Sequence, residues 1–304
     1  MIDEWKPGVH YLVGQTVKNG DKYYSCELEH TSQEEFDKFR FIKIRVTKED
    51  NIKKEEEITN GSRFVIITSM DRKYYEASGK AMMQSYKRHG RSIGPLFVYN
   101  EQLFEPKVKG VHKAGWMLGE EYVKFQRRHT NNKIKTFSKK AFPIIDAMDR
   151  FVEYDKIVWV DADAIFKEDF PRMLIELLSP EDVLSTHFSV WHKKDEKEYH
   201  SCETGFFILN RRHPGYEEFC NLYKDIYYND LAEEYDLRRF YDGEVYGKCV
   251  ELMEQKGHKM FNLNTGKHKT PISRSLIAPY ISHFKAGLKD NIDFTKYLDE
   301  EDEI

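Results

Sequence analysis

The chain has 304 residues, of which 40% are hydrophobic and 33% charged, and its formal net charge is −4. The length suits one large domain, alone or with a small module, and the composition is that of a globular protein with a heavily charged surface. The net charge excludes a uniformly basic protein built for polyanions, and no apolar segment approaches membrane-spanning length.

The N-terminus and the cysteines indicate the compartment. The opening residues, MIDEWKPG, lack the basic and apolar regions of a signal peptide. The four cysteines lie far apart, without the pairing of a metal site, and fit free thiols in a reducing compartment: Cys26, Cys202, Cys220 and Cys249. We expect a soluble cytoplasmic protein without membrane attachment.

Residues 1–46 have the texture of a small separate β module. Aromatic residues alternate with glycines, and Asn19-Gly20 is a tight-turn signal between short strands. The pattern W-x-x-G-x-x-Y-x-x-G from Trp5 to Gly14 resembles small chitin-binding-like modules found in chitinases and phage proteins. That resemblance implies a sugar-stacking face with Trp5 and Tyr11, although a tiny domain also needs aromatics simply to build a core. Residues 47–61 are rich in charge and predict a solvated linker.

An α/β pattern begins after Arg63. Phe64–Thr68 predicts a buried strand, a helix with its apolar residues at helical spacing follows and ends at Gly90, and Pro95–Tyr99 predicts a second strand. This β-α-β unit with parallel strands opens an α/β nucleotide-binding fold. No glycine fingerprint follows the first strand, which argues against a dinucleotide site.

Residues 107–140 form a basic, aromatic-containing stretch inside an acidic protein. They hold ten Lys and Arg against two Glu. One interpretation is a solvated loop and helix face. The other is a surface that meets a polyanion such as double-stranded DNA, with cations on phosphates and rings on bases.

Two carboxylates close the next predicted strand. A helix is predicted from Pro143 to Phe151, with the proline in its first turn. Ile157–Val160 is a short apolar run of β-branched and aromatic residues, which predicts a buried strand. Asp161 and Asp163 follow it, separated by one residue, and point the same way if the backbone stays extended. Their mutual repulsion would be removed by a hard divalent cation, Mn²⁺ or Mg²⁺, which in turn binds phosphates. The alternative is a capped strand end with solvated acids.

The C-terminal half continues the alternation of strands and helices. We predict strands over 182–187 and 206–209, a helix over 215–228, and another helical stretch that follows Asp242-Gly-Glu244 and runs up to Met253. Residues 189–200 are polar and predict a loop that acts as a mobile lid. The chain then places His283, Lys285 and Lys289 on a short strand and turn, before an acidic tail.

With these features in order, residues 62–290 resemble the metal-dependent glycosyltransferases of the GT-A fold, and most nearly the retaining families that include glycogenin and galactosyltransferases. The motifs that carry the resemblance are the β-α-β start, the D-A-D-A strand end, E-T-G-F-F-I-L-N and H-F-K-A-G-L-K. It implies a Rossmann-like mixed sheet flanked by helices. The domains would be a β module (1–46), a linker (47–61), the transferase domain (62–290) and a tail (291–304).

The resemblance also implies a site. Asp161, Asp163 and His283 would hold Mn²⁺ or Mg²⁺ on the diphosphate of a nucleotide sugar, foremost a UDP-sugar, and Lys285 and Lys289 would contact that diphosphate. In the family's usual C-terminal motif, H-F-x-G-x-x-K, the glycine lies three residues after the histidine, whereas Gly287 lies four residues after His283. That departure predicts a rearranged loop in which Lys285 takes over part of the phosphate contact.

The resemblance implies roles for further residues from their positions in the sequence. Thr68, Asp71 and Tyr74 would bind the base and ribose, and Lys139 (or Lys140) loosely matches a cation upstream of the metal-binding strand. Glu203 and Asp242 lie where the family keeps groups near the reacting sugar. Each could instead be a surface acid or a helix N-cap, Asp242 especially.

The acceptor is the least determined part. The phage-like module and the basic stretch lead to one hypothesis, that glucose or arabinose is transferred to 5-hydroxymethylcytosine in phage DNA, with base flipping. A cell-surface glycan is the enzymatic alternative. Two other classes stay open, a carbohydrate-binding protein with an inactive transferase domain and a two-metal nucleotidyltransferase. The second is disfavoured because no glycine-rich phosphate loop follows Phe64–Thr68.

Overall fold

The computed structural model describes residues 62–100, 108, 110–114, 119–194, 197–264, 272–284 and 293–298, together with Lys6 and six short strands within the first 46 residues. Among these residues, no helix combines the length and the apolar character that a bilayer crossing requires.

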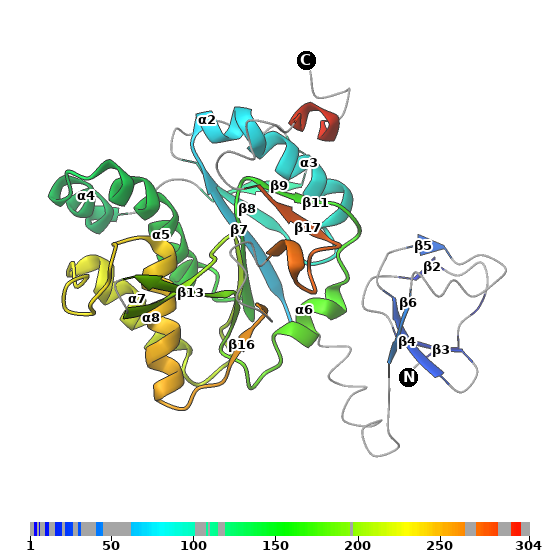
Figure 1. The fold of residues 1–304 in the computed structure, drawn as a ribbon. Coiled ribbons are helices and arrows are strands. Elements are labelled where there is room, and N and C mark those ends of the chain that lie inside the picture. Colours follow the sequence, from blue (N-terminus) through cyan, green and yellow to red (C-terminus); the bar gives the residue numbers. More distant parts are fainter. Residues whose placement is uncertain are drawn as a thin grey trace.

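The N-terminal strands form sheets of their own (Figure 1). One sheet has the order β1-β3-β4-β6, and β2 pairs with β5. Their bounds are β1 Asp3–Glu4, β2 His10–Tyr11, β3 Thr16–Asn19, β4 Lys22–Cys26, β5 His30–Thr31 and β6 Phe41–Ile44. In the β3–β4 hairpin Asn19 is paired with Lys22, so the two strands meet next to the predicted turn, whose Gly20 lies outside the described residues. Trp5, the side chain of Tyr11 and residues 47–61 lie outside the described residues, so the chitin-binding-like face stays a prediction.

A seven-stranded mixed sheet, of order β16-β12-β15-β10-β7-β8-β9, forms the centre of the larger unit (Figure 1). The strands are β7 Phe64–Met70, β8 Leu96–Asn100, β9 Val111–Lys113, β10 Lys156–Val160, β12 Ser185–His187, β15 Phe206–Asn210 and β16 Met260–Asn262. Only β15 runs against its neighbours. The predicted Rossmann-like mixed sheet is therefore confirmed.

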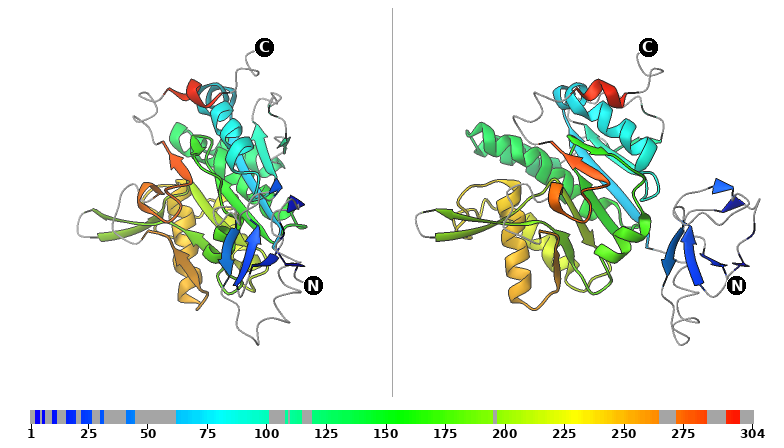
Figure 2. Two further views of the ribbon diagram at one scale, coloured as in Figure 1. Left: turned by 90° about the vertical axis from the view of Figure 1, so that its right-hand side faces the viewer. Right: turned by 45° about the vertical axis from the view of Figure 1, so that its right-hand side comes forward.

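Helices cover both faces of this sheet because its strands are apolar on both sides. Along β10, Ile157 and Trp159 join one buried cluster, whereas Val158 and Val160 join the other. The first cluster packs under α5 (Asn132–Arg150), α7 (Tyr216–Tyr228), α8 (Asp242–Gln255) and one residue of α4 (Gly119–Arg128). The second packs under α3 (Lys80–His89) and α6 (Arg172–Leu178). Figures 1 and 2 show the resulting three layers.

The first β-α-β unit matches the sequence pattern. A one-turn helix α2 (Arg72–Tyr74) and a π-helical turn η1 (Tyr75–Gly79) lead without a break into α3, which ends at Gly90. Strand β8 then pairs in parallel with β7, as predicted. Gly79 lets the Met70 side chain pack against the π-helical turn, because a Cβ there would lie 2.5 Å from Sδ of Met70.

Helix α5 begins earlier than the sequence indicated. It starts at Asn132, with the Asn131 side chain accepting from Lys133 N, so Pro143 is an interior residue and the prediction that it lies in the first turn is wrong. An interior proline leaves the carbonyl four residues earlier without its helical donor. That carbonyl belongs to Lys139, and the Ser69 hydroxyl on β7 donates to it at 3.2 Å. The neighbouring strand therefore satisfies the group that the proline leaves open.

The segment predicted to be a loop and lid is instead a β-hairpin. Strands β13 (Ser189–Lys194) and β14 (Lys197–Cys202) pair along their whole length, and the hairpin extends from the body in Figure 2. The loop was predicted because the segment is polar. The strand pair packs on α8, where Nδ1 of His200 lies 3.1 Å from the Gly247 carbonyl oxygen. Gly247 allows this approach, because a Cβ would lie 2.8 Å from Cα of Ser201.

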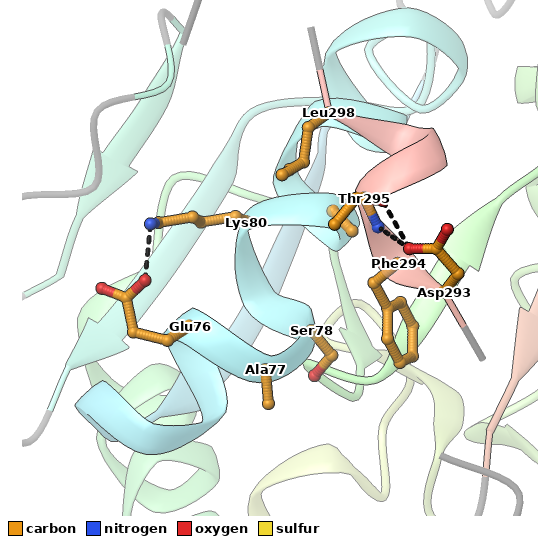
Figure 3. Close-up of a pocket in the computed structure, with 9 residues that line it drawn as sticks. Glu76, Ala77, Ser78, Lys80, Asp293, Phe294, Thr295 and Leu298 are labelled. Atoms are coloured by element: carbon orange, nitrogen blue, oxygen red, sulfur yellow. Dashed lines mark hydrogen bonds and ion pairs between the residues drawn. The ribbon is translucent and has the colours of Figure 1, made fainter. Parts of the chain in front are cut away.

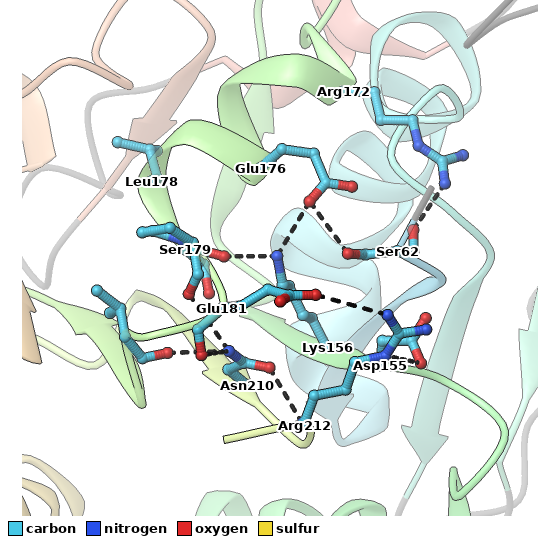
Figure 4. Close-up of polar contacts among 12 residues, drawn as sticks. Ser62, Asp155, Lys156, Arg172, Glu176, Leu178, Ser179, Glu181, Asn210 and Arg212 are labelled. Atoms are coloured by element: carbon cyan, nitrogen blue, oxygen red, sulfur yellow. Dashed lines mark hydrogen bonds and ion pairs between the residues drawn. The ribbon is translucent and has the colours of Figure 1, made fainter. Parts of the chain in front are cut away.

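A buried polar network fixes the starting end of β10 (Figure 4). Asp155 accepts hydrogen bonds from Arg63 N at 2.6 Å and from Arg212 Nε at 2.9 Å. The Lys156 ammonium, almost fully buried, donates to Glu176 Oε2 at 3.0 Å and to the Ser179 carbonyl. This network anchors the end of β10 that lies opposite Asp161.

Part of the expected tail is folded. Residues Phe294–Tyr297 form a 3₁₀ helix, η4, with the Asp293 side chain accepting from Thr295 N at 3.0 Å. Figure 3 shows this helix beside α3, where a pocket of about 230 Å³ lies between them and an ion pair joins Glu76 to Lys80. The described part of 291–304 therefore packs against the larger domain.

Candidate active site and metal centre

The two aspartates lie where β10 leaves the sheet. Asp161 N donates to the Gly205 carbonyl at 3.0 Å, and Ala164 N donates back to the Asp161 carbonyl at 3.0 Å, so the chain turns over 161–164. The next strand, β11 (Ala164–Phe166), is fully buried. Because both ends of the turn are hydrogen-bonded, Asp161 and Asp163 have little freedom of position.

Strand pairing brings a distant histidine to these aspartates. Strand β17 (Ile281–His283) pairs antiparallel with β11, with His283 opposite Ala164. Phe284 N also donates to the Asp163 carbonyl at 3.2 Å. The predicted triad is therefore brought together by the register of one short ladder.

The three side chains form a cluster suited to a divalent ion. Nε2 of His283 lies 3.1 Å from Oδ1 of Asp163 and 3.4 Å from Oδ2 of Asp161, and one ligand atom from each residue falls within 4.8 Å of the others. Adjacent ligand atoms on an octahedral ion are about 3 Å apart when each is about 2.1 Å from the ion. Two carboxylate oxygens and an imidazole nitrogen fit Mn²⁺ or Mg²⁺, so the residues present fit the expected metal.

The charges at this point favour a cation. Burial would lower the pKa of His283, but its contacts with Asp161 and Asp163 outweigh burial and raise the pKa to about 9. Burial would likewise raise the pKa of Asp161, yet the neighbouring Lys140 and His283 hold it well below its usual value. Both shifts show that positive charge is stabilised between the carboxylates.

Lys140 connects the metal cluster to Asp242. Its ammonium lies 2.6 Å from Asp161 Oδ1 and 3.3 Å from Asp242 Oδ2, and it donates to the Thr204 carbonyl. Burial lowers the pKa of Lys140, but Asp161 and Asp242 together raise it above its usual value. Trp159 Nε1 also donates to Asp161 Oδ1, at 2.7 Å. Of the two lysines that the sequence offered, Lys139 and Lys140, both line the cleft, and Lys140 contacts Asp161 and Asp242.

The two predicted catalytic acids have different surroundings. Asp242 is the first residue of α8, whose N-cap is Tyr241, so Asp242 does not cap the helix; it accepts from the Thr204 hydroxyl at 2.5 Å. Glu203 lies on the far side of His283, with Oε1 at 3.6 Å from Nδ1. Asp242 therefore faces the Lys140 and Asp161 side of the site, whereas Glu203 backs the histidine.

All of these side chains line one cleft of about 660 Å³, large enough for a nucleotide sugar. One wall is aromatic, since the Phe137 and Tyr241 rings lie 4.4 Å apart and the Arg239 guanidinium lies over Tyr241. Buried Glu244 fixes that wall by accepting from Arg238 and Arg239. The opposite end is formed by the residues that follow β7.

The remaining predicted donor-site residues divide into three groups. Asp71, Tyr74 and Lys139 line the cleft, and Asp71 also caps α2 by accepting from Tyr74 N at 2.8 Å. Thr68 is completely buried within β7 and does not line the cleft, because the strand continues two residues further and Ser69 and Met70 reach the cleft instead. Lys285 and Lys289 lie outside the described residues.

Several cations of the basic stretch 107–140 make contacts within the protein. Lys124 pairs with Glu120 and Glu121, the Arg128 guanidinium donates to the Tyr227 and Tyr228 carbonyls at the end of α7, and Lys140 lies in the site. Arg127 and Lys133 are exposed. Within the described residues, the surface available to a polyanion is smaller than the composition indicated.

No protein-family model matches the chain, and no curated protein matches it. Solved structures do resemble it. They include the bifunctional glycosyltransferase WbbM (14% identity, TM-score 0.47, covering 78% of this chain and 49% of that one) and the galactosyltransferase LgtC with donor and acceptor sugar analogues (13%, 0.45, 78% and 98%). A third is a glycosyltransferase involved in glycosylating the major capsid of PBCV-1 (13%, 0.42, 76% and 100%). The chain spans about half the length of WbbM, and likeness at such identities concerns the fold alone.

Proposed function

We propose that this chain is a metal-dependent glycosyltransferase that moves a sugar from a nucleotide-diphosphate sugar, foremost a UDP-sugar, to an acceptor hydroxyl. The observation that carries the proposal is the cluster of Asp161, Asp163 and His283 at the wall of the large cleft. A divalent ion held there would stabilise the negative charge that develops on the departing diphosphate. Asp161, Asp163 and His283 would hold the ion, and phosphate oxygens of the donor would complete its ligands.

The chain's own residues have separable roles in this proposal. Asp71, Tyr74 and Lys139, at the end of the cleft near β7, bind the nucleoside. The Lys140 ammonium fixes Asp161 and Asp242 and keeps positive charge beside the leaving group. Asp242 faces the sugar, where its carboxylate stabilises the positive charge that builds at the anomeric carbon as the bond to oxygen breaks. Lys285 and Lys289 would add diphosphate contacts.

Retention of anomeric configuration fits the surroundings of the acids. An inverting enzyme needs a carboxylate that is placed to deprotonate the acceptor. Among the cleft residues that the structure describes, Asp242 is bound by Lys140 and Thr204, and Glu203 by the Gly205 backbone. Glu244 is bound by two arginines, and Asp71 by the α2 backbone. These acids are committed to cations and donors, which supports a retaining transfer.

The donor half-reaction tests the proposal without an acceptor. Wild-type protein with Mn²⁺ and a panel of UDP-, GDP- and dTDP-sugars is expected to release nucleoside diphosphate, and D163N is expected to lower that rate at least about 100-fold. If the protein instead released pyrophosphate from a nucleoside triphosphate and a sugar 1-phosphate, and did not cleave the nucleotide sugars, it would be a nucleotidyltransferase. No release with any sugar, together with unchanged thermal stability on adding donor and Mn²⁺, would indicate an inactive carbohydrate-binding domain.

For the acceptor, cytoplasmic transfer to 5-hydroxymethylcytosine in phage DNA and transfer to a cell-surface glycan are separated by a binding measurement. If duplex DNA is the acceptor, replacing Arg127 and Lys133 by alanine should reduce the slope of log K against log salt by about 0.9 per lost phosphate contact. The matched control replaces Lys224 and Lys259, which pair with Asp149 and Asp182 elsewhere. Equal salt slopes in both double variants would rule out DNA contact by this surface and favour the glycan.

A further inference from the structure

Three consecutive residues, Glu203 to Gly205, contact four charged residues of the site. Glu203 lies beside His283, the Thr204 carbonyl and hydroxyl bind Lys140 and Asp242, and the Gly205 carbonyl accepts from Asp161 N. The turn enters β15, the strand paired with β10. It therefore lies directly behind the cluster, on a rigid part of the sheet.

The contact between Glu203 and His283 has a specific chemical meaning. When Nε2 of a histidine binds a metal, Nδ1 carries the proton, and a carboxylate or carbonyl that accepts it fixes the ring. Oε1 of Glu203 is 3.6 Å from Nδ1, and both side chains are less than 10% exposed. That separation exceeds a hydrogen bond by about half an ångström, a distance that a small side-chain rotation covers.

The carboxylate is itself held in place. Gly205 N donates to the same Oε1 at 3.2 Å, so the Glu203 side chain folds back over its own turn towards the histidine. Glu203 also lines the cleft, and its Oε1 lies on the Nδ1 side of the imidazole.

We propose that Glu203 is a positioning residue that accepts the Nδ1 proton of His283 and thereby aims Nε2 at the site of the metal. The inference rests on the proposed function only in that a divalent ion binds there. Glu203 then controls metal affinity and the tautomer of His283, and it does not react with the sugar.

Mn²⁺ affinity, measured from the electron paramagnetic resonance signal of free Mn²⁺, tests this with two variants of similar size. Glu203→Leu removes the acceptor and is expected to weaken binding 10- to 100-fold. Glu203→Gln keeps an acceptor oxygen and is expected to stay within about fivefold of wild type. The same two substitutions at Glu218, which pairs with His258 away from the cleft, provide the matched control and should change nothing.

A spectroscopic readout covers the case in which the leucine variant fails to fold. Ring nitrogen shifts of His283 in the Mg²⁺-loaded wild-type protein should report a proton on Nδ1, and Glu203→Gln should preserve it. Equal Mn²⁺ affinity in wild type and Glu203→Leu, or a proton on Nε2, would overturn the role of Glu203 alone. Failure of the wild-type protein to bind Mn²⁺ would instead overturn the metal centre, and this inference with it.

Discussion

Replacing Gly205 by alanine is expected to lower both Mn²⁺ affinity and the rate of donor cleavage about 100-fold in a protein that remains folded. The added Cβ would lie 2.6 Å from Cε1 and 2.7 Å from Nδ1 of His283, closer than such atoms approach. The imidazole must then move, and a displacement of about 1 Å at a catalytic centre costs about two orders of magnitude. Overpacking costs about 1–3 kcal/mol of stability, which most domains tolerate.

A matched substitution separates this effect from general strain. Gly215 meets another histidine in the same way, because a Cβ there would lie 2.7 Å from Cε1 and Nδ1 of His258. Gly215→Ala should therefore destabilise the protein by a similar amount, measured by denaturant unfolding, while Mn²⁺ affinity stays at the wild-type level. If Gly205→Ala bound Mn²⁺ as tightly as Gly215→Ala, the position of His283 could not matter for the metal.

The second large effect is expected at Lys140. Lys140→Met removes the ammonium that lies between Asp161 and Asp242, leaving two partly buried carboxylates without their cation. We expect the rate of donor cleavage at saturating UDP-sugar to fall about 100- to 1000-fold, in line with the loss of one preorganised charge at a reacting centre. Loss of a partner from a buried pair also costs about 3–5 kcal/mol of stability.

The neighbouring lysine provides the comparison. Lys139 lines the same cleft, but Lys140 is the residue that contacts both acids. Lys139→Met is therefore expected to weaken donor binding and to leave the maximal rate within about tenfold of wild type. A larger loss of maximal rate in Lys139→Met than in Lys140→Met would show that the wrong lysine has been placed at the leaving group.

Much of the sheet was predictable because its strands are short apolar runs bounded by turns. The β7–α3–β8 unit, β10 and β15 all follow that pattern, and each is confirmed. Helix α5 was predicted to start eleven residues too late because the sequence alone gives no sign that Ser69 satisfies the carbonyl opposite Pro143. The β13–β14 hairpin was missed because its polar strands pack on a helix and do not form part of the central sheet.

The sequence predicted the metal ligands of the candidate site better than the residues that hold those ligands in position. Asp161 and Asp163 were identified from chemistry at a strand end, and His283 from a resemblance, yet their meeting depends on the β11–β17 register, which no local pattern encodes. The choice between Lys139 and Lys140 depends on helix phase. The position of Glu203 behind His283 depends on a turn whose contacts are made by backbone as much as by side chains.

The central claim is that one divalent ion binds between Asp161, Asp163 and His283. An anomalous difference map from a crystal soaked with Mn²⁺ and a UDP-sugar tests it most directly. A single strong peak bounded by the two carboxylates and Nε2 of His283, next to the diphosphate, is the predicted result. The claim would be contradicted by diphosphate bound in the cleft with Mn²⁺ saturating and no peak at that position.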